Sequence, residues 1–192
     1  MNKQIRIVGF HGPMGSGKST AIGLLDTHVK ANLELVKFAQ PLYDMQEMIY
    51  NRINSVYVRP PEFVKDRKLL QWIGTEWGRD SISKTLWIDL WKAKAESLLK
   101  SHEELFTDPL IVVCDDVRFE NEAETIRAMG GVIIKINTQK NLDRITTANG
   151  IKNHSSEVSL PNNLVDLTVD NNGTLEQYQS NLKQAFKELK LI

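Results

Sequence analysis

The chain has 192 residues and carries equal numbers of basic and acidic side chains, 24 Lys and Arg against 24 Asp and Glu. This length suits one domain, and zero formal net charge argues against wholesale binding to nucleic acid or an anionic membrane. The single cysteine excludes an intrachain disulfide and a cysteine-based zinc site, and no run is apolar enough for a membrane span or signal peptide, so we expect a cytoplasmic protein.

Five short apolar runs are predicted to be strands, with helical segments between them. They cover residues 5–10, 34–39, 110–115, 132–137 and 164–169. The first, third and fourth are almost continuously apolar, which is typical of parallel strands covered on both faces. The alternation of strands and helices predicts an α/β fold, a doubly wound, five-stranded parallel sheet in a single domain.

Capping residues mark the predicted starts of two helices. Asn121 with Glu124 indicates a helix start, and Thr174 with Gln177 indicates the start of a C-terminal helix.

The connection between the second and third strands is far longer than a crossover needs, so residues 40–109 are predicted to be a helical insertion, with Trp87 and Trp91 packed in its core. Polar residues 138–161 are predicted to form a lid.

Residues 12–19, Gly-Pro-Met-Gly-Ser-Gly-Lys-Ser, match the phosphate-loop pattern G-x-x-x-x-G-K-[ST] in full. The glycines let successive backbone N–H groups face phosphate oxygens, beside the N-terminus of a helix. We expect Lys18 to reach the β- and γ-phosphates and the Ser19 hydroxyl to ligate Mg²⁺. The predicted ATP site is Gly12, Pro13, Met14, Gly15, Ser16, Gly17, Lys18, Ser19 and Thr20.

Two carboxylates and an arginine follow the third predicted strand. Neighbouring side chains on an extended strand point to opposite faces, so one of Asp115 and Asp116 faces the phosphates, and Asp116 is the predicted Mg²⁺ ligand. Arg118 is suited to bidentate contact with a phosphoryl group, and Arg144 is the best candidate for a cation from the lid. The predicted catalytic residues are Lys18, Asp116, Arg118 and Arg144.

These features favour a small kinase. A GTPase would need an Asn-Lys-x-Asp motif, which is absent, and the chain is too small and too neutral for a helicase motor. Arg67 and Arg79 in the insertion are candidates for holding an acceptor phosphate. Gln71 and Thr75 would share a helix face with Arg67 and could read a base or a sugar hydroxyl.

Four segments resemble the deoxynucleoside monophosphate kinases of tailed bacteriophages: Phe38-Ala-Gln-Pro-Leu42, Leu69-Leu-Gln-Trp-Ile-Gly-Thr-Glu-Trp-Gly-Arg79, Asp116-Val-Arg-Phe-Glu-Asn-Glu-Ala123 and His154-Ser-Ser-Glu157. The resemblance implies a P-loop kinase that uses ATP and Mg²⁺ to convert a dNMP to a dNDP, in the host cytoplasm if the chain is phage-encoded. It implies an acceptor site of Lys37, Phe38, Ala39, Arg67, Gln71, Thr75, Trp77, Arg79, Arg118 and Glu122.

Some questions stay open from the sequence. Gln40 and Tyr43 stand where the family pattern has Asp and Lys, which leaves the roles of those positions undecided. The expected partners are small-molecule nucleotides, without nucleic acid or membrane, and a homodimer is left open. Two alternatives to a dNMP kinase remain: a kinase of another small acceptor, such as dephospho-coenzyme A, and a nucleotide-switched binding module.

Overall fold

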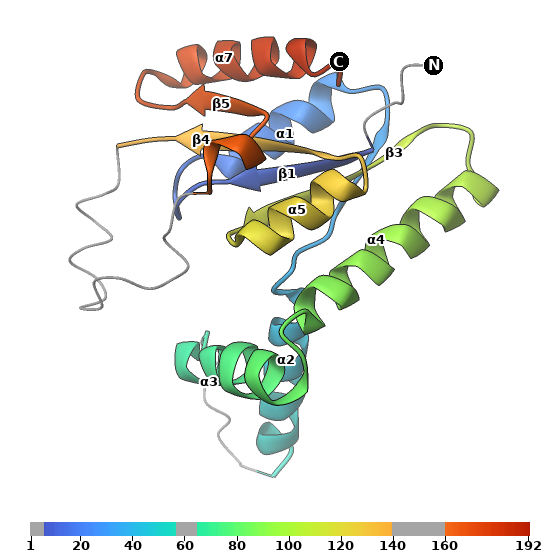
Figure 1. Ribbon diagram of the computed structural model, residues 1–192, viewed down its shortest axis with the longest axis vertical. Helices are drawn as coiled ribbons and strands as arrows, with labels where there is room; N and C mark the ends of the chain where they lie inside the picture. The colour runs from blue at the N-terminus through green and yellow to red at the C-terminus, as the bar shows by residue number, and fades with distance from the viewer. Residues whose placement is uncertain (1–5, 57–64, 140–159) are drawn as a thin grey trace. The chain divides into compact units, whose positions relative to one another are not determined.

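The computed structural model describes residues 6–56, 65–139 and 160–192 (Figure 1). These residues belong to two compact units. The first runs to Val36 and resumes at Ala95, and the second is Lys37–Lys94. The predicted insertion, residues 40–109, overlaps the second unit, whereas its residues 95–109 belong with the first. The predicted lid lies outside the described residues except at its two ends.

A five-stranded parallel sheet with the order β2-β3-β1-β4-β5 forms the centre of the first unit. Its strands are β1 Ile7–His11, β2 Asn32–Leu35, β3 Leu110–Val117, β4 Val132–Asn137 and β5 Leu167–Asp170. β1 is buried along its whole length, and Gly9 is paired with both Cys114 of β3 and Ile133 of β4. The prediction of a doubly wound α/β fold is confirmed.

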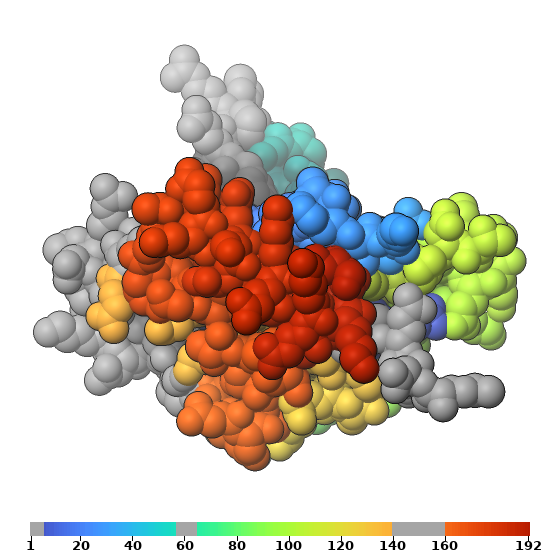
Figure 2. All heavy atoms as spheres, turned by 90° about the horizontal axis from the view of Figure 1, so that it is seen from above, coloured from blue at the N-terminus to red at the C-terminus, as the bar shows by residue number. Residues whose placement is uncertain are grey.

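Helices cover both faces of this sheet (Figure 1). On one face, α1 (Lys18–His28) and α7 (Leu175–Glu188) pack their apolar side chains against those of β1, β3 and β4. α7 occupies the middle of this side of the molecule in Figure 2. On the other face, α5 (Glu120–Ala128) approaches so closely that a Cβ on Gly9 would lie 2.9 Å from the Cδ1 atom of Ile126. Glycine therefore allows this helix to reach the sheet.

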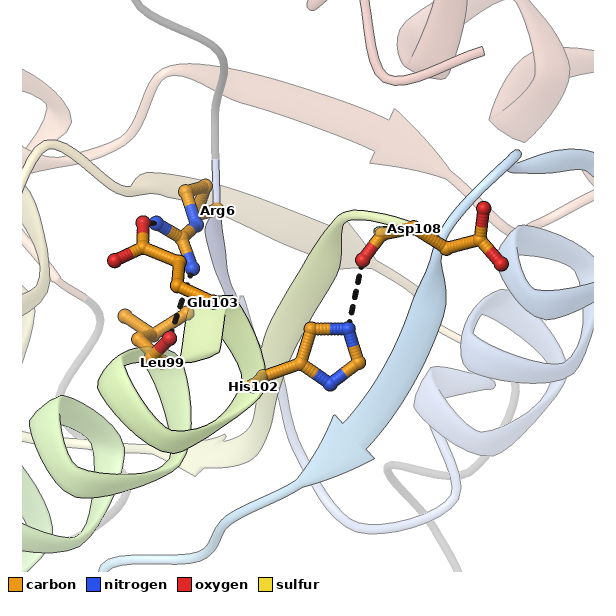
Figure 3. A network of polar contacts seen from close by, with 5 residues as sticks. All are labelled: Arg6, Leu99, His102, Glu103 and Asp108. Carbon is orange, nitrogen blue, oxygen red and sulfur yellow. Dashed lines mark hydrogen bonds and ion pairs between the residues drawn. The ribbon is translucent and has the colours of Figure 1, made fainter. Parts of the chain in front are cut away.

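The last turns of α4 (Leu86–Leu105) are fixed to the start of β1 (Figure 3). The Arg6 guanidinium pairs with the Glu103 carboxylate and donates to the Leu99 carbonyl at 3.3 Å. The Nε2 atom of His102 lies 2.7 Å from the Asp108 carbonyl oxygen, which fixes the turn before β3. The Arg6 bonds therefore connect the sequence-distant α4 and β1, whereas the His102 bond is local.

The second unit is helical, with α2 (Gln40–Asn54), α3 (Arg67–Trp72), η1 (Ile73–Ile82) and the first turns of α4. Phe38 stacks on Trp91 with ring centroids 4.6 Å apart, and Trp87 is also buried, as the sequence predicts for both tryptophans. η1 is a π-helix. The Trp87 indole donates to the Gly74 carbonyl at 2.8 Å and packs against Gly78, where a Cβ would lie 2.3 Å from its Cζ2 atom.

Two predicted strands lie at different residues. β2 begins at Asn32, which pairs with Leu110, and the chain leaves the sheet after Val36, whose N–H donates to the Val113 carbonyl at 2.8 Å. The prediction of residues 34–39 is therefore wrong at both ends, because Phe38 packs in the second unit. β5 begins later than predicted, because Asn162–Leu164 form a 3₁₀ turn, η3.

The predicted start of α5 is also wrong, whereas that of α7 is confirmed. α5 begins at Glu120, and Glu122 rather than Glu124 reaches back to the N–H of Phe119, at 3.1 Å. In α7, the backbone N–H of Gln177 donates to the Thr174 hydroxyl at 3.3 Å. The side-chain oxygen of Gln177 accepts in turn from the backbone N–H of Thr174 at 2.8 Å. Among the described residues, no helix is both long and apolar enough to cross a membrane.

Candidate active site

The loop between β1 and α1 has the backbone conformation that its glycines allow. Gly12, Gly15 and Gly17 have φ angles of 154°, 74° and 101°, in the region that side chains disfavour. A Cβ on Gly12 would also lie 2.8 Å from the Ile136 carbonyl oxygen. A side chain at any of these positions would therefore strain the backbone, and at Gly12 it would also clash with Ile136.

Lys18 folds back over this loop. Its Nζ donates to the Gly12 carbonyl at 2.8 Å and to the Pro13 carbonyl at 2.9 Å. Lys18 is the first residue of α1, and no acidic side chain lies in the first turn or caps it. The N-terminus of α1, with Ser19 and Thr20 exposed, therefore favours an anion.

The Ser16 hydroxyl gives a second indication that the loop accommodates phosphate. Ser16 is fully buried, and its Oγ has no hydrogen-bond partner among the described residues. A buried hydroxyl without a partner is unfavourable, and a ligand oxygen would satisfy it. Together with the glycine conformations, this orphaned hydroxyl fits a phosphate group in the loop.

β3 bulges where its two carboxylates lie. Cys114 is paired with Gly9 and Val117 with His11, so Asp115 and Asp116 together oppose one residue of β1. The Cys114 thiol donates to the Asp116 carboxylate at 3.2 Å, which places Asp116 on the α5 side. A Cβ on Gly9 would lie 3.0 Å from Val117 Cγ2, so Val117 is on that side too. The alternation of side chains along β3 therefore breaks between Asp116 and Val117, whereas Asp115 and Asp116 keep the opposite faces expected from the sequence.

The alternation that precedes the break assigns Asp115 to the other side of β3. Val113, two residues earlier, packs in the core beneath α1, and counting in twos along the strand places Asp115 on the same face. Lys18 begins the helix that covers this face. The geometry thus favours Asp115 over Asp116 as the carboxylate that turns toward the phosphate loop.

Glu122 shapes the turn that presents Arg118. The residue is only 3% exposed, and one carboxylate oxygen accepts from the backbone N–H groups of Arg118, at 2.8 Å, and Phe119, at 3.1 Å. The Arg118 side chain is exposed. The Glu122 carboxylate lies at the start of α5, where it fixes the backbone beside Arg118, and its contact with the substrate stays a prediction.

His11 joins three segments beside the loop, a connection that the sequence did not reveal. Its Nδ1 lies 2.9 Å from the Val117 carbonyl, and its Nε2 accepts from the Leu160 N–H at 3.4 Å. This pattern requires the neutral imidazole, with the proton on Nδ1. Burial, reinforced by the charges of Lys135 and Lys18, lowers the pKa of His11 although the bond to Val117 opposes that shift.

Half of the predicted acceptor residues lie on α3 and η1 of the second unit. Arg67, Gln71 and Thr75 are exposed, and Trp77 and Arg79 are half-buried. Hydrogen bonds in a π-helix run from i to i+5, so the four-residue spacing used to group Gln71 with Thr75 does not describe the helix from Ile73 onward. Phe38 is buried against Trp91, while Lys37 and Ala39 beside it are half-buried.

The two positions that depart from the family pattern have partners within the second unit. The Gln40 amide donates to the Asp44 carboxylate at 2.8 Å, and the Tyr43 hydroxyl accepts from Lys65 Nζ at 2.7 Å.

Arg144 and the His154–Glu157 segment lie outside the described residues. In the first unit, Asp115 and Asp116 lie at the carboxyl end of β3, and Arg118 follows them. Lys18 and Ser19 come after the carboxyl end of the neighbouring parallel strand β1. Ligands bind at such an edge in open α/β sheets.

Comparison with known proteins identifies the family. The model of the family described as "Deoxynucleotide monophosphate kinase" matches residues 13–182. The chain belongs to this family. It is therefore a phosphotransferase with a P-loop kinase fold, as the sequence predicts.

Individual relatives agree with this assignment. A protein of Acanthamoeba polyphaga mimivirus, provisionally named a deoxynucleotide monophosphate kinase, is 29% identical over 197 residues, which cover 92% of this chain and 93% of that protein. The deoxynucleoside-5'-monophosphate kinase of Escherichia phage T5 is 24% identical over 63% of this chain and 71% of its own length. The crystal structure of TT1252 from Thermus thermophilus has a TM-score of 0.50 at 19% identity, covering 97% of this chain and 99% of that one, which supports the fold.

Proposed function

We propose that this family member transfers the γ-phosphoryl group of ATP, bound with Mg²⁺, to a deoxynucleoside monophosphate, giving ADP and a dNDP. One observation carries the donor half of the proposal: a complete phosphate loop in which Lys18 Nζ folds back onto the Gly12 carbonyl at 2.8 Å. Family membership supports the acceptor half.

The main contribution of the protein to phosphoryl transfer is to align two phosphates and to stabilise charge. The N–H groups of the loop and the Lys18 ammonium would hold the β- and γ-phosphates, and Arg118 would stabilise charge on the transferring group. The Ser19 hydroxyl, with Asp115 or Asp116, would hold Mg²⁺ beside the phosphates, a donor set of oxygens that suits this ion. When bound, Mg²⁺ neutralises part of the phosphate charge.

The second unit supplies the acceptor-binding side chains in this proposal. Arg67 and Arg79 bind the monophosphate, for which a planar guanidinium is well suited. Gln71, Thr75 and Trp77 contact the nucleoside. Because few of these side chains could read a base edge, we expect more than one dNMP to serve as acceptor.

The decisive experiment is an ADP-release assay with ATP and Mg²⁺ and a panel of acceptors. At least one of four dNMPs should raise turnover far above the ATP-only rate, with ribonucleoside monophosphates and dephospho-coenzyme A assayed in parallel. Stimulation by dephospho-coenzyme A alone would show that this compound, and not a dNMP, is the acceptor. ATP binding without stimulation by any acceptor would favour a nucleotide-switched module.

A matched pair of variants tests the acceptor site separately. Arg67→Ala should raise the KM for the dNMP while leaving the KM for ATP unchanged. Lys68→Ala removes the neighbouring exposed cation from the same helix and should change neither constant. Equal effects of the two substitutions would show that Arg67 contributes only general positive charge.

A further inference from the structure

Two side chains from the C-terminal part of the chain donate hydrogen bonds to backbone carbonyls of the phosphate loop. The Tyr178 hydroxyl, on α7, donates to the Gly17 carbonyl at 2.9 Å. The Asn171 amide, in the first position after β5, donates to the Ser16 carbonyl at 2.8 Å. More than 150 residues separate each donor from its acceptor. The loop therefore depends on bonds from a distant segment.

Both donors are themselves fixed. Tyr178 is 1% exposed, and burial raises the pKa of its hydroxyl, which therefore remains a donor at neutral pH. The backbone N–H of Asn171 donates to the Asn137 carbonyl at 2.8 Å, and its carbonyl accepts from the Thr138 hydroxyl at 3.3 Å. Neither donor depends on a mobile surface rotamer for its position.

The two carbonyls belong to peptide groups whose N–H ends face the other way. The Ser16 carbonyl shares a peptide group with the Gly17 N–H, and the Gly17 carbonyl shares one with the Lys18 N–H. No described peptide bond is cis, so in each group the C=O and N–H bonds point in opposite directions. Fixing an oxygen therefore directs the N–H of the same group.

The Gly17 carbonyl also accepts the first hydrogen bond of α1, from the Ala21 N–H at 3.0 Å. Together with Tyr178, this bond occupies both acceptor positions of the oxygen. Hydrogen bonds to a carbonyl polarise the amide and strengthen its N–H as a donor. The geometry thus affects both the direction and the donor strength of N–H groups in the phosphate loop.

The close approach also explains the residue at position 17. A Cβ on Gly17 would lie 2.6 Å from the Asn171 amide nitrogen and 2.9 Å from the Tyr178 ring. Gly17 is therefore required for contact with these two side chains as well as for its positive φ.

We propose that Tyr178 and Asn171 are positioning residues for phosphoryl transfer, which direct the Gly17 and Lys18 N–H groups toward the phosphates of ATP. This inference rests on the proposed use of the loop for ATP. It assigns part of the donor site to the segment after β5 and to α7, and it places their effect on the donor nucleotide and not on the acceptor.

The test compares Tyr178→Phe, which removes only the hydroxyl, and Asn171→Ala with Asn181→Ala. The control residue lies on α7, and its amide donates to the Asp170 carbonyl at 3.1 Å without contacting the loop. Each single variant at positions 178 and 171 should weaken Mg²⁺–ATP binding by about fivefold, the effect of one hydrogen bond. The KM for the acceptor should stay within about twofold of wild type, and Asn181→Ala should leave ATP binding unchanged.

Calorimetric titration with Mg²⁺–ATP alone gives the dissociation constant, so the result can be read even if no dNMP is phosphorylated. Thermal melting of each variant separates a structural role from a positioning role. Unchanged ATP affinity in Tyr178→Phe and Asn171→Ala, with melting temperatures lowered as in Asn181→Ala, would overturn the proposal. So would an equal loss of affinity for ATP and for the acceptor.

Discussion

The buried thiol of Cys114 donates a hydrogen bond to the Asp116 carboxylate, 3.2 Å away at the carboxyl end of β3. This contact holds Asp116 on the side of α5, while the alternation from Val113 places Asp115 on the side of α1 and Lys18. The two neighbouring carboxylates therefore have different environments, and they should differ in their importance for a metal-dependent reaction.

We expect Asp115→Asn to lower the activity at a fixed Mg²⁺ concentration by about 10- to 100-fold, the range found when a metal site loses a supporting group. Asp116→Asn should have the smaller effect. Titrating activity against Mg²⁺ for both variants checks this, because a lost ligand raises the Mg²⁺ concentration needed for half-maximal rate. A damaging Asp116→Asn beside a near-normal Asp115→Asn would restore the assignment made from the sequence.

Lys18→Ala should lower kcat by at least about 100-fold, because it removes a positive charge from the place where negative charge develops in the transition state. The lost bonds include those to the Gly12 and Pro13 carbonyls, and we expect the variant to keep a cooperative melting transition. Lys30→Ala, beyond the opposite end of α1, is the control. Substantial retained activity in Lys18→Ala would contradict the role given to the loop.

Substitutions at Glu122 and Arg118 should have different effects, the first on stability and the second on activity. Glu122→Ala leaves the N–H groups of Arg118 and Phe119 without their acceptor, and we expect it to lower the free energy of unfolding by about 1–3 kcal/mol. Arg118→Ala, at an exposed side chain, should stay within about 0.5 kcal/mol of wild type while lowering kcat/KM. Urea denaturation and steady-state kinetics on both variants measure the two effects. Equal destabilisation by both would contradict this division.

His11 should make stability sensitive to mild acid. Its pKa in the folded chain lies below the unfolded value of 6.5, so both states are neutral above that pH and the unfolded chain takes up the proton first as the pH falls. Stability should therefore be lost below about pH 6.5, with a slope of at most about 1.4 kcal/mol per pH unit. Urea unfolding at several pH values should show a shallower acid loss in His11→Gln. Parallel curves for the two proteins would contradict the assignment of this loss to His11.

Local patterns made much of this fold predictable. β4 has the bounds expected from its apolar run, and the phosphate loop lies between a buried strand and a helix as its motif requires. Both signals depend on neighbours within a few residues of each other. The start of α7 was predictable for the same reason, since Thr174 and Gln177 satisfy one another across one helical turn.

The features that escaped prediction depend on distant residues. The bulge at Asp115 and Asp116 follows from pairing with β1, more than 100 positions earlier, and the sequence offers no local sign of it. η1 has a π-helical hydrogen-bond pattern, while Trp87, which comes after it, packs against Gly74 and Gly78, so a 3.6-residue periodicity could not describe it. The bonds from Asn171 and Tyr178 to the phosphate loop are long-range in the same sense.

Cys114 is the only cysteine of the chain, and it is completely buried in β3. Burial, with the Asp116 charge beside it, raises the pKa of the thiol well above its usual value, and both effects suppress attack by alkylating reagents. Modification at this position therefore requires β3 to become accessible, so the labelling rate reports local opening of the sheet. For the same reason, a cysteine introduced on the surface would accept a fluorophore or spin label selectively in the otherwise unmodified protein.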